Sequence, residues 1–240
     1  MNILNIEHVS KLYGDKWIFD DISCGIQEGE KIGIIGINGT GKTTLLRIIA
    51  GTEEPDQGQV VRQNGAKLAY LTQLHEFPEE ETVLSYVISG SAAVKGSWGG
   101  TDAGDVDIME HEARSMLNTL GILEHDAKMG TLSGGQKKRA ALARTLLLPS
   151  DILILDEPTR GIDVGAKYEI YCIIADLAKQ GKSIIMISSE MSEIIGMSNR
   201  VMVMCDGRIT GFIDGKDATQ ENIMALATQF ETAPTAAANQ

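Results

Sequence analysis

The sequence predicts an α/β fold built around a parallel β-sheet, and three observations lead to this prediction. Short apolar runs alternate with helical stretches along the 240 residues. A strand at residues 31–35 leads through a glycine-rich loop into a helix at 43–50, the order of a strand–loop–helix unit. Residues 152–155 are a continuous apolar run, as expected of a parallel strand that is buried on both faces.

Strands are assigned where apolar residues alternate with polar ones or run continuously between turn signals. They are expected at residues 3–9, 17–27, 31–35, 59–62, 67–71, 152–155, 183–187, 200–205 and 208–213. Helices are assigned to longer segments with apolar residues every three or four positions, several of them ended by glycine or proline. They are expected at residues 43–50, 82–89, 106–120, 136–148, 166–180 and 221–230.

The connections between these elements carry their own signals. Asn64-Gly65 and Asp206-Gly207 predict hairpin turns between the strands that flank them. Residues 90–105 hold five glycines and few apolar residues, so a flexible connection or a truncated insertion is expected there. Residues 231–240 predict a disordered tail.

Composition and charge exclude several classes of protein. Lys and Arg number 21 and Asp and Glu 33, a formal net charge of −12, so the chain does not hold nucleic acid by bulk charge. The apolar runs are far shorter than the about 18 residues that crossing a membrane requires, and the amino terminus lacks the pattern of a signal peptide. Three widely spaced cysteines fit reduced thiols. We therefore expect a cytoplasmic protein.

The glycine-rich loop has the pattern of a phosphate-binding site, G-x-x-x-x-G-K-[ST]. Glycines let backbone N–H groups point at an anion, and the following helix adds the positive end of its dipole. Lys42 is expected to reach the β and γ phosphates, and the Thr43 hydroxyl to ligate Mg²⁺. The predicted nucleotide-binding residues here are Gly36, Ile37, Asn38, Gly39, Thr40, Gly41, Lys42, Thr43 and Thr44.

Two acidic residues follow the buried strand at residues 152–155. Ligands bind at the carboxyl ends of parallel strands, so Asp156 is expected to reach Mg²⁺, directly or through water. Glu157 is expected to orient or deprotonate a water that attacks the γ phosphate. Taken alone, the same residues also fit a strand followed by an acidic helix cap.

A second helix start has the character of an anion site. Leu132, Ser133, Gly134, Gly135 and Gln136 open the helix at 136–148, with Ser133 as its cap. One nucleotide rarely needs two such helix ends from one subunit. We therefore expect this loop to close the site of another subunit, and a plain capped helix is the alternative.

Together these residues resemble an ATP-binding cassette (ABC) ATPase over nearly all of residues 1–230. The resemblance implies a P-loop NTPase fold: a RecA-like core, an antiparallel β subdomain and a helical subdomain at about 82–148, in a single nucleotide-binding domain. Residues 36–43 match the Walker A motif, 132–136 the signature motif and 152–156 the Walker B motif, with Glu157 as the catalytic carboxylate.

The same resemblance assigns three further residues. Gln73 falls on the Q-loop glutamine that senses Mg²⁺, and Asp163 on the D-loop aspartate. Tyr13 falls on the aromatic that stacks on adenine, although simple strand packing also explains an aromatic there. The cofactors implied are ATP and Mg²⁺. A head-to-tail homodimer, or pairing with another cassette, is implied as the assembly.

Two different relatives are resembled at a finer level. Residues 1–157 are similar to ABC-F proteins, which act on ribosomes, whereas residues 156–230 are similar to the second cassette of galactoside and ribose importers. Three hypotheses follow: the ATPase subunit of a membrane permease, a soluble ribosome-associated factor, and a recombined or engineered cassette with no dedicated partner. Lys137, Lys138 and Arg139 are basic, and a solvated helix face explains them better than RNA binding.

One position departs from the family pattern. The family places a histidine after the strand at 183–187, and here that position is Ser189. The four histidines, His8, His75, His111 and His125, all precede that strand. Because a serine hydroxyl is shorter and uncharged, we expect tight ATP binding with slow hydrolysis.

Overall fold

The protein is described by a computed structural model that covers residues 1–73, 77–94 and 103–229, without the side chains of 91–94 and 103–108. Its contacts divide the chain into two compact units, the first formed by residues 1–66 with those from Ser183 onward, and the second by Lys67–Lys182. Each unit is described by itself. The single domain expected over residues 1–230 stays a prediction, and the expected tail at 231–240 lies outside the described residues.

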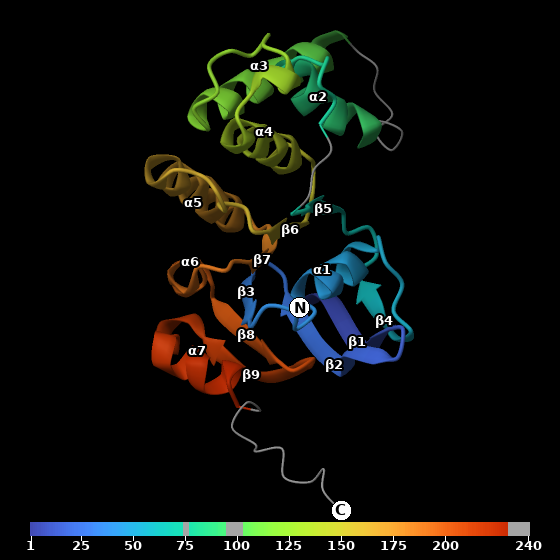
Figure 1. Ribbon diagram of the computed structural model, residues 1–240. Helices are drawn as coiled ribbons and strands as arrows, with labels where there is room; N and C mark the ends of the chain where they lie inside the picture. The colour runs from blue at the N-terminus through green and yellow to red at the C-terminus, as the bar shows by residue number, and fades with distance from the viewer. Residues whose placement is uncertain (74–76, 95–102, 230–240) are drawn as a thin grey trace, which may run out of the picture. The chain divides into compact units, whose positions relative to one another are not determined.

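The first unit contains two groups of strands (Figure 1). An antiparallel sheet has the order β2–β1–β4, and a second group has the order β7–β3–β8–β9, in which only β9 is antiparallel. The strands are β1 (Asn2–Tyr13), β2 (Lys16–Gln27), β3 (Lys31–Gly36), β4 (Gln57–Arg62), β7 (Ser183–Ile187), β8 (Arg200–Cys205) and β9 (Arg208–Asp214). The helices are α1 (Lys42–Ala50), α6 (Met191–Met197), α7 (Gln220–Ala227) and the short 3₁₀ turn η3 (Gly215–Asp217).

The core of this unit lies on the parallel strands. Ile32 and Ile34 of β3 are buried, as are the four residues of β8 from Val201 to Met204. Four apolar residues of α1 are buried as well: Leu45, Leu46, Ile48 and Ile49. Their burial holds this helix in the core, directly after the strand and loop that precede it. The long apolar runs of the sequence are therefore core strands, as the pattern predicted.

The second unit pairs two parallel strands with a helical region (Figure 1). Strands β5 (Leu68–Leu71) and β6 (Ile152–Asp156) pair in register, Leu71 opposite Leu155. The helices are α2 (Val83–Val94), α3 (Ala103–Thr119), α4 (Gly134–Leu146), α5 (Val164–Lys179) and the 3₁₀ turn η2 (Met129–Thr131). Helices α2, α3 and α4 pack against one another, and α4 also contacts β5.

One hairpin prediction is confirmed and the other is wrong. Strands β8 and β9 form the expected hairpin, with Asp206 and Gly207 both at positive φ, 46° and 72°. The strands on either side of Asn64-Gly65 do not pair with each other. Strand β4 pairs with β1, and β5 pairs edge to edge with β6. The surroundings of the two strands differ, because Ala69 and Leu71 of β5 are buried and β6 is buried throughout, whereas β4 is mostly exposed.

The prediction of a flexible connection at 90–105 is wrong at both ends of this segment, which are helical. Residues 90–94 continue α2, and α3 begins at Ala103; residues 95–102 lie outside the described part. Gly90 is buried inside the helix, where a Cβ would lie 2.5 Å from Cγ of Arg144. The Arg144 guanidinium lies 4.7 Å from the centre of the Tyr86 ring. This glycine therefore permits close packing of α2 on α4, and is not a sign of flexibility.

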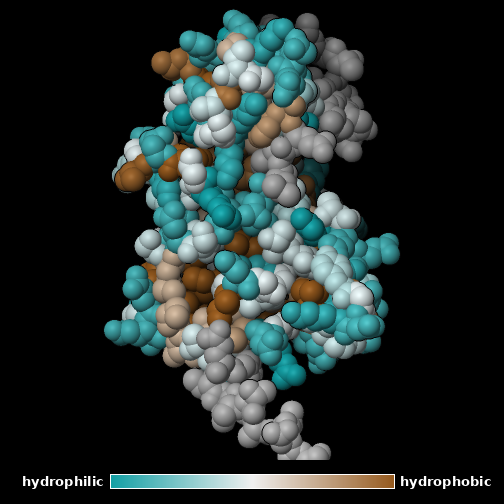
Figure 2. Space-filling view, viewed as in Figure 1, coloured by the Kyte–Doolittle hydropathy of each residue, from teal (hydrophilic) through white to brown (hydrophobic). Residues whose placement is uncertain are grey.

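The sequence interpretation also missed α6, a helix of seven residues that is too short for a periodic pattern. No helix in the described parts of the chain is long and apolar enough to cross a membrane. On the face drawn in Figure 2, hydrophilic side chains dominate and apolar residues form small separate patches.

The contact between β3 and α6 gives a test of the fold. A Cβ at Gly33 would collide with Oγ of Ser198 and lie 2.7 Å from Cγ2 of Ile194. We expect Gly33→Ala to lower the free energy of unfolding by about 1–3 kcal/mol through overpacking, measured by urea denaturation. Gly196→Ala in α6 is the control, because a Cβ there meets nothing within 4 Å. It is expected to stabilise by about 0.5–1 kcal/mol, and equal losses in both variants would contradict the packing argument.

Candidate functional site

The loop between β3 and α1 has the backbone of an anion site. Gly39 and Gly41 have φ values of 89° and 88°, a region that other residues rarely adopt. A Cβ at Gly41 would lie 2.6 Å from Cγ2 of Ile18, and one at Gly36 would collide with the carbonyl oxygen of Met204. The loop is thus pressed against β2 and β8, and glycine is required where it is tightest.

The start of α1 has the features of an anion site. Gly41 is the N-cap and supplies no side-chain hydrogen bond to the first turn. The Lys42 ammonium donates to the carbonyl oxygens of Gly36 and Ile37, at 2.7 and 2.9 Å, so its charge lies on the loop itself. Thr43 is partly exposed and Thr44 is buried. Uncapped amides, a helix dipole and a lysine charge together favour a phosphate group at this point.

A cavity of about 420 Å³ lies beside this loop. It is lined by Lys16, Trp17, Ile18, Ile37, Asn38, Gly39, Thr40, Cys205, Asp206 and Gly207. The sequence interpretation missed Trp17, which is 46% exposed and is the aromatic residue of this cavity. An aromatic two residues after a strand-to-strand turn carries no signal by itself, because strands commonly hold aromatic residues.

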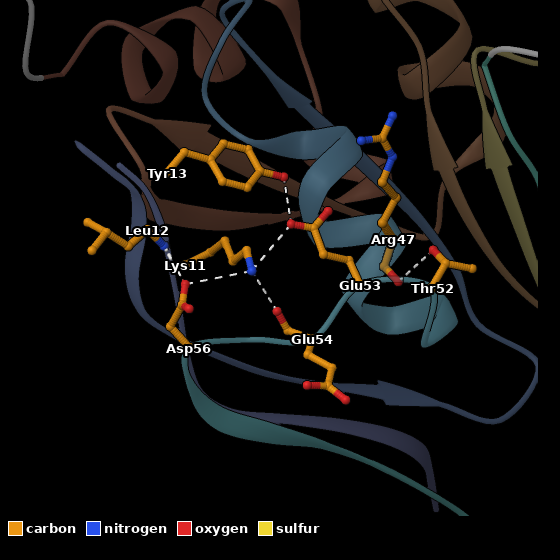
Figure 3. Close-up of polar contacts among 8 residues, drawn as sticks. All are labelled: Lys11, Leu12, Tyr13, Arg47, Thr52, Glu53, Glu54 and Asp56. Atoms are coloured by element: carbon orange, nitrogen blue, oxygen red, sulfur yellow. Dashed lines mark hydrogen bonds and ion pairs between the residues drawn. The ribbon is translucent and has the colours of Figure 1, made fainter. Parts of the chain in front are cut away.

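Tyr13 lies at the end of β1 and is also 46% exposed. Its hydroxyl donates to Oε1 of Glu53 at 2.6 Å, and the Lys11 ammonium lies 5.7 Å from the centre of its ring (Figure 3). Tyr13 is therefore held by polar contacts and is not packed into the core, which the alternative of simple strand packing would have required.

In the second unit the carboxyl ends of β5 and β6 bring three predicted residues together. Gln73, Asp156 and Glu157 line one small cavity of about 10 Å³, with Leu71, Thr72, Lys138 and Pro158. The parallel register explains this, because both strands end at the same edge. Asp156 is 2% exposed. The expected grouping of Gln73 with the two carboxylates is present within this unit.

Glu157 has a strained backbone. Its φ is 53°, in the left-handed region that costs most side chains about 1–2 kcal/mol. Strain of this kind persists where the surroundings hold it, and it gathers at functional positions. The acidic helix cap considered as an alternative does not need such a conformation.

Lys138 is partly buried and makes contacts that the solvated helix face expected from the sequence does not account for. Its ammonium donates to the carbonyl oxygen of Arg160 at 2.8 Å, and it lines the cavity of Asp156 and Glu157. Burial lowers the pKa of Lys138, nearby Arg160 lowers it further, and Glu157 raises it. Lys137 also has a contact, since its ammonium lies 5.9 Å from the centre of the Phe77 ring.

The loop at Leu132–Gln136 is a capping box. Oγ of Ser133 accepts from the backbone N–H of Gln136 at 3.3 Å, and Oε1 of Gln136 accepts from that of Ser133 at 3.0 Å. A Cβ at Gly134 would meet nothing within 4 Å, whereas one at Gly135 would lie 3.4 Å from the Gly161 carbonyl oxygen. The loop is preformed, with an open backbone at Gly134.

The last two predicted positions lie at element ends. Asp163 caps α5, its Oδ1 accepting from the backbone N–H of Ala166 at 3.0 Å, and this hydrogen bond lowers the pKa of the carboxyl. Ser189 follows β7 in the first unit and is exposed. Next to it, buried Ser188 donates to Oε2 of Glu193 at 2.6 Å.

A phosphate loop after a parallel strand, with two carboxylates after another buried parallel strand, defines an α/β P-loop nucleotide-binding protein. The family model described as "ABC transporter" matches residues 19–160, more than half of the chain. The chain therefore belongs to the ABC transporter family.

Two relatives are importer proteins by name. The chain is 40% identical over 229 residues to the galactose/methyl galactoside import ATP-binding protein MglA of Clostridium tetani, covering 88% of this chain and 45% of that protein. It is 35% identical over 247 residues to the ribose import ATP-binding protein RbsA of Oceanobacillus iheyensis, covering 94% of this chain and 48% of that protein. The chain thus spans less than half the length of these curated relatives.

Solved structures share the fold. An ATP-binding subunit of an ABC transporter superposes with a TM-score of 0.82 at 19% identity, covering 94% of this chain and 99% of that one. A dimeric ATP-binding cassette in a post-hydrolysis state, bound to ADP and Pi, gives a TM-score of 0.77 at 22% identity over 88% of this chain and 98% of that one. The α/β P-loop fold of an ABC cassette is thus confirmed.

The strain at Glu157 gives a second test. We expect Glu157→Gly to raise the free energy of unfolding by about 0.5–1 kcal/mol, because glycine adopts this backbone conformation without a Cβ penalty. Glu157→Gln keeps the Cβ and is expected to change it by less than about 0.5 kcal/mol. Urea denaturation measures both, and a destabilised glycine variant would show that the backbone here is not strained.

Proposed function

We propose that this chain binds Mg-ATP and hydrolyses it slowly at a head-to-tail interface between two cassettes. The observation that carries the proposal is the loop at residues 36–43. Gly39 and Gly41 have positive φ, the helix start has no side-chain cap, and the Lys42 charge lies on the loop. These features suit a triphosphate, and membership of the ABC transporter family makes ATP the nucleotide.

The residues take the roles expected from the sequence. Lys42 neutralises the β and γ phosphates, and backbone N–H groups of the loop and of the first turn of α1 donate to them. Glu157 orients the attacking water and accepts its proton. Tyr13 stacks on adenine.

The proposed metal is Mg²⁺. Oxygen atoms of Thr43, Gln73 and Asp156 are the donors, and this set fits a hard cation that keeps waters and phosphates among its ligands. Within the described residues no group of three or more His, Cys, Asp or Glu gathers as a cation site.

The signature loop acts on the nucleotide of a second cassette. Its capping box fixes the backbone, its glycines leave the amides open, and it has no lysine of its own between Leu132 and Gln136. Such a loop suits a role beside a phosphate that another loop already neutralises. Asp163, held as the cap of α5, is the D-loop residue of the same interface.

Among the partners considered, a membrane permease is favoured over a ribosome. The match to a sugar-import ATP-binding protein covers 88% of the chain. A match of that length has to include residues on both sides of position 157, where the resemblance to ABC-F proteins gives way to the resemblance to sugar importers. A recombined origin is not needed to account for such a match. We therefore propose that the chain is a cassette of a sugar importer, peripheral to the membrane through its permease.

The missing histidine predicts weak turnover. We expect the parent chain to bind ATP and turn it over slowly, and Ser189→His to raise the rate by about 10–100-fold, because a positioned group near the γ phosphate is restored. The measurement is the rate of phosphate release with Mg-ATP. Ser189→Asn is the control of similar size without an imidazole. A fast parent, or an equal gain with asparagine, would contradict the role of position 189.

Two further variants separate binding from hydrolysis. Glu157→Gln is expected to lower turnover by at least about 100-fold while ATP affinity stays within about threefold, and to accumulate an ATP-bound dimer. Lys42→Ala is expected to lose ATP affinity itself, because the loop loses its charge. Phosphate release, calorimetric titration and light scattering report the three quantities. If Glu157→Gln keeps the parent rate, another group activates the water.

A further inference from the structure

A cluster of charged side chains lies beside Tyr13, and none of the predicted motifs includes it (Figure 3). Lys11 and Tyr13 come from the end of β1, and Glu53 and Asp56 from the segment between α1 and β4. The side chains of Lys11 and Glu53 are only 12% and 19% exposed. Charged groups are seldom withdrawn from water to this extent unless they are paired.

Glu53 is held by the end of α1. Gly51 ends the helix in the left-handed conformation, with φ 76°, and the backbone N–H groups of Thr52 and Glu53 both donate to the carbonyl oxygen of Arg47, at 3.0 and 3.3 Å. The helix that begins at the phosphate loop therefore ends in the turn that carries Glu53. Its nine residues set the separation between these two points.

The carboxylate of Glu53 holds the tyrosine. The Tyr13 hydroxyl donates to Oε1 at 2.6 Å, which is a short hydrogen bond to a charged acceptor. An exposed tyrosine ordinarily exchanges rotamers within nanoseconds. This contact restricts the ring while leaving 46% of the residue open to solvent.

Lys11 completes the cluster, because its positive charge compensates the negative charges of Glu53 and Asp56. Its ammonium donates to the Glu54 carbonyl oxygen at 2.7 Å and lies 3.4 Å from Oε1 of Glu53 and 3.7 Å from Oδ2 of Asp56. The same Oδ2 accepts from the backbone N–H of Leu12 at 2.7 Å, next to Tyr13 in the chain. Lys11 thus keeps two carboxylates close to each other and to the ring.

We propose that Glu53, supported by Lys11, is a positioning residue that fixes the Tyr13 ring relative to the phosphate loop and so sets the affinity for the adenine base. The proposal rests on the proposed function, because it takes Tyr13 as the residue that stacks on adenine. A ring held before binding loses less conformational freedom when a base stacks on it. Glu53 follows the carboxyl end of α1, whereas the phosphate loop precedes its amino end, so its effect is expected on the base and not on the phosphates.

The test compares two ligands of the 240-residue chain. ATP presents both a base and phosphates, whereas inorganic tripolyphosphate presents phosphates alone. Both are titrated with Mg²⁺ by calorimetry into the parent and into Glu53→Ala, Glu53→Gln, Tyr13→Phe and the double variant Glu53→Ala with Tyr13→Phe. Glu54→Gln is the matched control, because it removes the same charge one residue away, where only the backbone carbonyl of Glu54 contacts Lys11.

We expect Glu53→Ala and Tyr13→Phe each to weaken ATP binding by about 5–10-fold, since each removes the same charge-assisted hydrogen bond. The double variant is expected to be no weaker than the worse single one. Glu53→Gln keeps an oxygen acceptor and is expected to lose less. Tripolyphosphate affinity is expected to stay within about twofold of the parent in all of them, as is ATP affinity in Glu54→Gln.

Several results would overturn the proposal. Equal losses for ATP and tripolyphosphate in Glu53→Ala would make its role structural only. If Glu54→Gln lowers ATP affinity as much as Glu53→Gln does, the effect is one of general charge and not of the contact between Glu53 and Tyr13.

Tyr13→Ala and Trp17→Ala separate this failure from that of the proposed function. If Tyr13→Ala weakens ATP binding and Glu53→Ala does not, the positioning role alone fails. If Trp17→Ala weakens it and Tyr13→Ala does not, the base lies against the other aromatic, and both the stacking role of Tyr13 and the positioning role of Glu53 fall. Both roles also fall if the parent chain binds tripolyphosphate but gains no affinity from the base of ATP.

Discussion

The close approach of the phosphate loop to its neighbours is the constraint on which the rest of the first unit depends. Backbone N–H groups can converge on one anion only if the chain turns back on itself without side chains in the way. Gly41 lies against Ile18 of β2, and Gly36 against the backbone of β8 at Met204. The loop is therefore shaped by β2 on one side and by β8 on the other, and its geometry sets where α1 begins.

Local signals predicted the elements well, because buried strands and capped helices are encoded by their own residues. The hairpin at Asp206-Gly207 and the buried runs at β6 and β7 are examples. Long-range choices were not encoded locally. Asn64-Gly65 does make a turn, but the partners of β4 and β5 are decided by which surfaces each strand buries. Gly90 gave the same signal as a loop glycine, and only the Arg144 side chain beside it explains its place in a helix.

The candidate site divides in the same way. Motif spacing located Gly36 to Thr43, Ser133 to Gln136 and Asp156-Glu157, because each motif is a strand end or a helix start with a chemical requirement of its own. Lys138, Trp17 and Glu53 were not found from the sequence. Their significance depends on what they touch: the Arg160 carbonyl, the loop cavity and the Tyr13 hydroxyl. A lysine on a helix, or a glutamate after one, is ordinarily a solvated residue.

Each functional motif is supported by neighbours within its own unit. In the first, α1 joins the phosphate loop to the turn of Glu53 and thereby to Tyr13. In the second, the signature helix is joined to the segment after Glu157 by Lys138 at Arg160 and by the close approach of Gly135 to Gly161. Under the proposed function, the residues that hold the nucleotide and those that cleave it are thus organised by separate packing. A substitution that loosens one arrangement need not loosen the other, so ATP affinity and turnover are separable properties of this chain.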